Sequence, residues 1–118
     1  MIKSLDALVL FAYCILIYYL SSQSQLPVPK LFSWQDKLEH FSAYALMGVL
    51  AWRCFGHYID RIIILAITSF LFCSIHGGLD EYHQSFVAGR VSDITDWIAD
   101  TLGGAFAIFL LYKRGRNF

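Results

Sequence analysis

Three side chains near the middle of the sequence have the types and the spacing that chemistry requires. Asp36, His40 and Tyr44 follow one another at intervals of four residues. With about 3.6 residues per helical turn, this spacing places the three on one face of a helix. A carboxylate beside an imidazole can act in general acid–base catalysis or bind a divalent metal ion. Lys37 adds a cation next to the same face.

A second set repeats this spacing further along the chain. His76, Asp80 and Gln84 are again four residues apart, and Glu81 is adjacent to them. The set comes at the end of a long apolar run, where a helix would leave an apolar environment. We therefore expect a second polar helix face that begins inside this environment and ends outside it.

A third set consists of carboxylates only. Asp93, Asp96 and Asp100 lie within a narrow arc of a helix, and after Thr101 the sequence becomes apolar. Asp93 also suits the N-cap of that helix. Charged groups inside a membrane are costly unless they face protein, water or a partner. The carboxylates are therefore predicted to point into a helix bundle.

The elements that must position these groups are membrane helices. Of the 118 residues, 58% are apolar and only 15% are charged. Four apolar stretches, at about 4–21, 38–56, 59–78 and 94–112, are each close to the roughly 20 residues that a transmembrane helix needs. Alternating hydrophobicity, which is typical of a membrane barrel, is absent. We predict an all-α, four-helix transmembrane bundle formed by a single domain, 1–118.

The distribution of basic residues predicts the orientation of this bundle. Six Lys and Arg residues fall on the side of the two termini: Lys3, Arg53, Arg61, Lys113, Arg114 and Arg116. Three fall on the other side: Lys30, Lys37 and Arg90. By the positive-inside rule both termini face the cytoplasm, and the loops 21–37 and 79–92 share the outer face.

In this topology all three polar sets lie at the outer face, which predicts one shared polar pocket there. Arg90, the one basic residue of its loop, would pair with the carboxylates or hold an anionic ligand. The predicted ligand-binding residues are Asp36, Lys37, His40, Tyr44, Asp80, Glu81, Gln84, Arg90, Asp96 and Asp100. The candidates for a catalytic role are His40, Asp80, Glu81 and Asp96.

Other features of the sequence have simpler interpretations. Cys14, Cys54 and Cys73 lie in apolar runs without CxxC spacing and are predicted to be buried free thiols. Gly103 and Gly104 indicate close helix packing. The Trp residues are predicted to be anchors at the membrane interface. Basic and acidic residues are equal in number, so nothing in the charge indicates a nucleic-acid partner.

Three blocks of the sequence together resemble the VanZ-like family of membrane proteins. The blocks are DKLEHFSAY (36–44), DEYHQSF (80–86) and GRVSDITDWIADTLGG (89–104). The resemblance covers nearly the whole chain and includes most of the predicted pocket residues. One departure is Asp100, which stands where many members carry Asn. That change adds a charge that needs a partner.

The resemblance implies a setting in the bacterial inner (cytoplasmic) membrane, and the family is linked to resistance to the glycopeptide teicoplanin. Three functions remain open. The pocket would bind the head group of an envelope lipid or cell-wall precursor. Alternatively, the chain would be a hydrolase or transferase acting on such a lipid-linked substrate. A divalent metal ion is left open for this enzyme, and no cofactor motif is evident in the sequence. The third function is an ion-coupled transporter. With only four spans, a transporter would require a homo-oligomer, which the sequence leaves open.

Overall fold

The computed structural model describes residues 2–22, 31–88 and 93–115. Within these residues all regular structure is helical, with four helices and no strand. The helices are α1 (Ile2–Ser21), α2 (Gln35–Gly56), α3 (Ile62–Gln84) and α4 (Ile94–Arg114). The prediction of an all-α fold with four helices is therefore confirmed.

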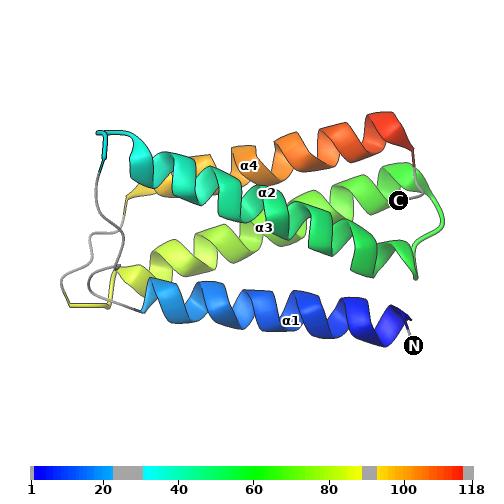
Figure 1. Ribbon diagram of the computed structural model, residues 1–118, viewed down its shortest axis with the longest axis horizontal. Helices are drawn as coiled ribbons and strands as arrows, with labels where there is room; N and C mark the ends of the chain where they lie inside the picture. Colours follow the sequence, from blue (N-terminus) through cyan, green and yellow to red (C-terminus); the bar gives the residue numbers. More distant parts are fainter. Residues whose placement is uncertain (1, 23–30, 89–92, 116–118) are drawn as a thin grey trace.

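The helices run alternately up and down the long axis of the molecule (Figure 1). The start of α1, the α2–α3 turn and the end of α4 lie at one end, which we call the terminal end. The end of α3 and the start of α4 lie at the opposite end, which we call the loop end. The most extensive packing joins α2 to α4, whereas α1 lies against α2 and, less closely, α3.

Two close approaches bring α2 and α4 together. A Cβ atom on Gly103 would lie 2.1 Å from the Phe41 carbonyl oxygen, so only glycine fits there. One on Gly48 would meet the Gly104 carbonyl at 3.2 Å. The predicted role of Gly103 and Gly104 in helix packing is thus confirmed, and the short distance allows polar side chains of the two helices to meet.

The polar end of α3 is helical rather than part of a loop. The sequence predicts an apolar span ending near residue 78 and a loop over 79–92, but α3 continues to Gln84. Asp80, Glu81 and Gln84 are all buried. The helix therefore continues beyond the apolar run, as the spacing of His76, Asp80 and Gln84 indicates, and these polar side chains face other helices rather than lipid.

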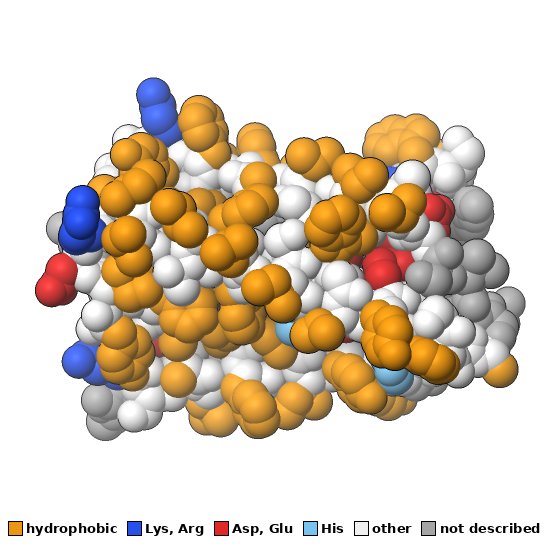
Figure 2. Space-filling view, turned by 180° about the vertical axis from the view of Figure 1, so that it is seen from behind, with side chains coloured by type: hydrophobic (Ala, Val, Ile, Leu, Met, Phe, Trp, Pro, Cys, Tyr) orange, Lys and Arg blue, Asp and Glu red, His pale blue; other side chains and the backbone are white. Residues whose placement is uncertain are grey.

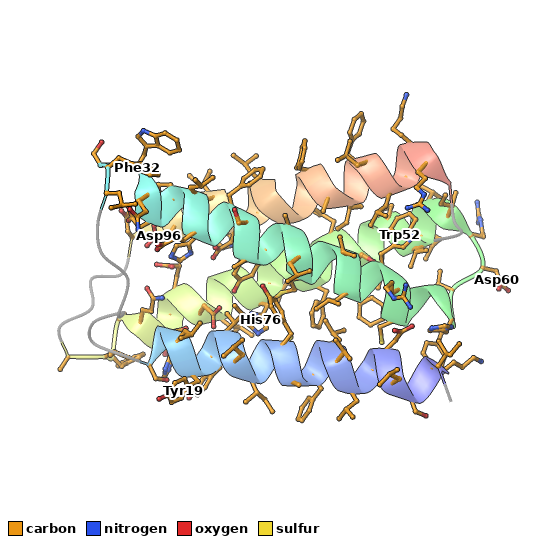
Figure 3. All side chains as sticks on the ribbon, viewed as in Figure 1. Tyr19, Phe32, Trp52, Asp60, His76 and Asp96 are labelled. Atoms are coloured by element: carbon orange, nitrogen blue, oxygen red, sulfur yellow. The ribbon has the colours of Figure 1, made fainter. Side chains whose placement is uncertain are left out.

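Apolar residues fill the bundle toward the terminal end. Trp52 packs with Leu65, Ile108 and Leu111 and is 1% exposed. The prediction of an interface anchor is wrong for Trp52. Its side chain is buried in the bundle, toward the terminal end where Asp60 lies (Figure 3). Trp is enriched at membrane interfaces, but this enrichment does not decide the position of any one residue. Here the space between α2, α3 and α4 is large enough for the indole ring of Trp52. All three cysteines are free thiols, and Cys54 and Cys73 are buried.

The face of the bundle seen in Figure 2 is apolar over much of its length. Large apolar side chains are exposed on every helix, including Phe11, Leu46, Ile67 and Phe109. By length and composition, α1, α3 and α4 can each cross a membrane. The more polar α2 runs alongside them (Figure 1). A membrane that encloses α1, α3 and α4 would also enclose α2. The membrane-spanning role of α2 stays a prediction.

Candidate functional site

The carboxylates of α4 face α2 near the loop end. Lys37 Nζ lies 2.6 Å from Asp96 Oδ1. One turn further along, His40 Nδ1 is 2.7 Å from Asp100 Oδ1, and its Nε2 is 3.7 Å from Asp96 Oδ2. Asp96 is 7% exposed and Asp100 is fully buried. The carboxylates therefore point into the bundle, and His40 pairs with Asp100 rather than with Asp36.

Asp93 fixes the start of α4. Its side chain accepts a hydrogen bond of 3.0 Å from the Thr95 backbone N–H, as expected for an N-cap. Lys37 Nζ lies 3.4 Å from the same carboxyl group and 3.2 Å from Asp36. The pKa of Asp93 is lowered, chiefly because Thr95 donates to its carboxylate and further because Lys37 lies close. One ammonium group thus lies among three carboxylates.

A second polar contact joins α2 to α3. The Tyr44 hydroxyl donates a hydrogen bond to Asp80 Oδ2. His76 Nδ1 is 3.0 Å from the same hydroxyl and 3.4 Å from Asp80. Tyr44 is 2% exposed and Asp80 is 5% exposed. His76 belongs to the spacing pattern seen in the sequence, although it is missing from the predicted ligand-binding set.

Glu81 connects α3 to the start of α4. Its Oε2 accepts a hydrogen bond of 2.9 Å from the Asp93 backbone N–H. Glu81 also brings a carboxylate to His40 and Asp100, so that one donor atom from each lies within 4.8 Å of the other two. These three donors, from α3, α2 and α4, could hold a metal ion.

A cavity of about 330 Å³ opens between the helices at the loop end. Its wall on α1 is largely apolar, with Ile17 and Leu20 beside Ser21. Its other walls, on α2, α3 and α4, carry most of the polar groups. The full lining is Ile17, Leu20, Ser21, Asp36, Glu39, His40, Ala43, Tyr44, Asp80, Gln84 and Asp96.

The structure describes nine of the ten predicted ligand-binding residues, and these nine lie at or near this cavity. Six of them line it: Asp36, His40, Tyr44, Asp80, Gln84 and Asp96. Lys37, Glu81 and Asp100 lie next to lining residues: Lys37 contacts Asp96, and Glu81 and Asp100 lie close to His40. Arg90 falls outside the described residues, so the structure says nothing of its predicted role.

Sequence reasoning missed two parts of the cavity. The first is Glu39, which lines the cavity. The sequence indicates this position only by its spacing, because Glu39 lies about one helical turn after Asp36. The wall on α1 has no signal, because Ile17 and Leu20 belong to an unbroken apolar run. It is positioned by long-range contacts, among them Tyr13 Oη to the Ala43 carbonyl at 2.6 Å and Ser22 Oγ to His83 Nε2 at 2.9 Å.

A separate polar cluster lies at the terminal end. Asp6 on α1 is 2.6 Å from His57 Nε2 and 3.3 Å from Arg53 Nε. Nothing in the local sequence predicts this contact, because its members are 47 and 51 residues apart. It ties the start of α1 to the end of α2, far from the cavity.

The apolar helices and the enclosed polar site together define a small multi-pass membrane protein. The chain belongs to the VanZ/LLP1 family, whose model matches residues 7–114. It is similar to the uncharacterized protein C11E3.10 of Schizosaccharomyces pombe, with 35% identity over 101 residues. That match covers 83% of this chain but 58% of the yeast protein, so the chain spans little more than half of its relative. No solved structure matches.

The relationship confirms the family that the three sequence blocks indicated. The family match includes all three blocks, from Asp36 to Gly104. Because the relative belongs to a fungus, membership alone does not identify a bacterial membrane as the setting. The family therefore identifies neither the ligand of the cavity nor the membrane in which the protein lies.

Proposed function

We propose that the chain binds the head group of an envelope lipid, or of a lipid-linked cell-wall precursor, in the cavity at the loop end. The observation that carries the proposal is the two-sided lining of the cavity. Ile17 and Leu20 offer an apolar wall, whereas Asp36, His40 and Asp80 offer a polar one. A ligand with an acyl or prenyl chain beside a polar head group matches both sides at once.

The polar groups of the cavity indicate which head group fits. Four carboxylates line it, from Asp36, Glu39, Asp80 and Asp96, against the single imidazole of His40. Gln84 Oε1 is a buried acceptor without a hydrogen-bond partner among the described residues. Acceptors of this kind are costly to bury unless a donor meets them. A head group with an amine or sugar hydroxyls beside its phosphate supplies such donors.

The proposal places the protein in the cytoplasmic membrane of a bacterium, with the loop end on the outer side. Lys3, Arg61 and Arg114 belong to the terminal end, in agreement with a cytoplasmic location of that end. An outward cavity would have access to lipids and precursors of the outer leaflet. The link between the VanZ-like family and glycopeptide resistance agrees with a ligand from the bacterial envelope.

A binding experiment with one matched pair of variants tests this function. The protein in nanodiscs is titrated with phosphatidylethanolamine, with phosphatidylglycerol and with a polyprenyl-pyrophosphate aminosugar, and bound lipid is counted by native mass spectrometry. Asp36→Asn changes an exposed acid at the cavity, and Asp60→Asn changes an exposed acid at the other end. We expect Asp36→Asn alone to weaken binding, by about tenfold for one lost charged hydrogen bond.

The three probes separate the two sources of the head group. Preference for phosphatidylethanolamine over phosphatidylglycerol assigns a membrane lipid with an amine. Preference for the aminosugar probe assigns a precursor. Equal binding of all three, or equal effects of the two substitutions, would contradict a specific head-group site.

A further inference from the structure

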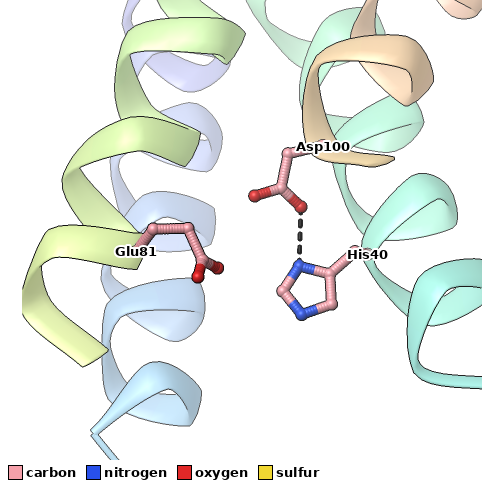
Figure 4. A group of neighbouring side chains, drawn as sticks. All are labelled: His40, Glu81 and Asp100. Atoms are coloured by element: carbon pink, nitrogen blue, oxygen red, sulfur yellow. Dashed lines mark hydrogen bonds and ion pairs between the residues drawn. The ribbon is translucent and has the colours of Figure 1, made fainter. Parts of the chain in front are cut away.

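The polar interior contains a donor set of which the lipid-binding proposal uses only one member, the imidazole of His40. His40 on α2, Glu81 on α3 and Asp100 on α4 point toward a common centre (Figure 4). One donor atom from each lies within 4.8 Å of the other two. We infer that these three side chains bind a divalent transition-metal cation, Zn²⁺ or Mn²⁺. This inference does not rest on lipid binding.

The chemistry of the donors selects the class of ion. One imidazole nitrogen and two carboxylates suit Zn²⁺ or Mn²⁺ better than Ca²⁺, which prefers oxygen ligands alone. Metal–ligand bonds of about 2.1 Å hold two donors no more than about 4.2 Å apart. The three donor atoms already lie within 4.8 Å of one another. Side-chain rotations that move each donor atom by about 1 Å would therefore bring all three to bonding distance from one ion.

Asp100 provides an independent reason to expect a ligand. Its side chain is 0% exposed, and its Oδ2 has no hydrogen-bond partner within the described ranges. Its Oδ1 meets His40 Nδ1 at 2.7 Å, while the other oxygen points toward α3, the helix that carries Glu81 (Figure 4). A buried carboxylate oxygen without a donor is costly, and a cation removes that cost.

Gly77 makes room for this carboxylate. A Cβ atom at Gly77 would lie 3.0 Å from both Cβ and Oδ2 of Asp100. That distance is shorter than ordinary van der Waals contact, so a side chain there would push Asp100 aside. The backbone of α3 thus leaves a space in which the second oxygen of Asp100 can rest close to the Glu81 side of the bundle.

The charges around the centre agree with a dication. Asp96 lies next to the ammonium group of Lys37, and Asp80 accepts a hydrogen bond from the hydroxyl of Tyr44. Glu81 and Asp100 bring two further carboxylates into the interior, where 7% and 0% of the residue is exposed. A divalent ion would bring positive charge to both carboxylates and replace the direct contact between His40 and Asp100.

Metal titration of the whole purified chain tests the inference. Chelator-treated protein without an affinity tag is titrated in detergent with ZnCl₂ and, separately, with MnCl₂ by calorimetry. We expect one ion per chain. We expect His40→Gln, Glu81→Gln and Asp100→Asn each to weaken binding by at least about tenfold, as ligand loss does.

Two control substitutions make the same chemical changes at the other end of the bundle. His57→Gln and Asp6→Asn remove an imidazole and a carboxylate that contact each other at 2.6 Å. We expect both controls to bind the metal as the unchanged protein does. Equal loss in controls and site variants would overturn the inference, and so would the absence of stoichiometric binding in the unchanged protein.

X-ray absorption at the zinc edge decides the matter even if the site variants fail to fold. The unchanged, zinc-loaded protein is expected to show nitrogen and oxygen neighbours at about 2.0–2.2 Å, including imidazole scattering. A sulfur neighbour at about 2.3 Å would assign the metal to cysteine and overturn the inference. A purely oxygen environment without imidazole would mean an adventitious ion only and would overturn it equally.

Discussion

The hydroxyl of Tyr44 on α2 donates a hydrogen bond to Asp80 Oδ2 on α3, deep in the bundle. Both residues are buried, at 2% and 5% exposure. Hydrogen bonds to a charged acceptor are stronger than neutral ones and gain further where water is excluded. This contact therefore holds two walls of the cavity together as well as satisfying a buried carboxylate.

Tyr44→Phe removes this donor while keeping the aromatic ring. We expect the free energy of unfolding to fall by about 1–3 kcal/mol, because a buried charged acceptor loses its hydroxyl partner. Equilibrium unfolding in detergent measures the change. Tyr82→Phe on the 68% exposed Tyr82 is the matched control and should shift stability by less than about 0.5 kcal/mol. Equal effects of the two substitutions would argue against the importance of the Tyr44–Asp80 contact.

Lys37 and Asp96 form the closest ion pair between α2 and α4 in the described part of the chain, at 2.6 Å. Lys37→Met leaves the buried Asp96 without its ammonium group. Asp96→Leu takes the nearest carboxylate from Lys37, which keeps only its longer contacts with Asp36 and Asp93. We expect each single change to destabilise the fold by about 1–3 kcal/mol, below the value for a fully buried pair because Lys37 is partly exposed.

The double variant should recover much of this loss, because the buried carboxylate is removed together with its ammonium partner, and the carboxylates that also lose Lys37, those of Asp36 and Asp93, are much more exposed. A double-mutant cycle in detergent unfolding gives the coupling energy. Additive effects, with no recovery in the double variant, would mean that the two side chains do not stabilise each other.

Local spacing predicted the polar faces of the helices correctly. Asp96 and Asp100 face α2 because their side chains lie on the same arc of α4 as the glycine at position 103, where α2 comes closest. The cost of placing charge in lipid leaves such residues one acceptable direction, so the sequence is informative about them. The same reasoning placed Tyr44 and Asp80 in the interior.

Contacts between distant segments could not be predicted in this way. The pair formed by Asp6 and His57 depends on how α1 is rotated against α2, and an apolar helix carries no pattern that fixes this rotation. The burial of Trp52 depends on the space that Leu65 and Ile108 leave between the helices. The spacing of His76, Asp80 and Gln84 indicated a helical face, but the length of α3 was underestimated, because its apolar run alone ends near residue 78.

Gly103→Ala should separate α2 from α4. Its new methyl group would lie 2.1 Å from the Phe41 carbonyl oxygen, which is backbone and has little freedom to move. We expect a loss of about 1–3 kcal/mol or more, as for an overpacked core. Gly78→Ala is the control, since its methyl group meets only Trp97 at 3.5 Å. There the higher helix propensity of alanine should leave stability unchanged or slightly raised. Thermal unfolding of both variants measures the difference, and a stable Gly103→Ala protein would contradict the observed helix approach.

The orientation of the bundle rests on the distribution of charge between its two ends. Lys3, Arg61, Lys113 and Arg114 belong to the terminal end, whereas Lys37 belongs to the loop end. Positively charged segments are retained on the cytoplasmic side during membrane insertion. The cavity at the loop end would then face outward, as the proposed function requires.

Two exposed positions test this orientation directly. Ser85 lies at the loop end just after α3, and Asp60 lies in the α2–α3 turn at the terminal end. We expect a membrane-impermeant thiol reagent to label Ser85→Cys in intact cells, and to label Asp60→Cys only after the cells are permeabilised. The unchanged protein is the control, because Cys54 and Cys73 are buried and Cys14 lies within an apolar helix. Labelling of Asp60→Cys but not of Ser85→Cys in intact cells would reverse the topology, and the cavity would then bind ligands of the cytoplasmic leaflet.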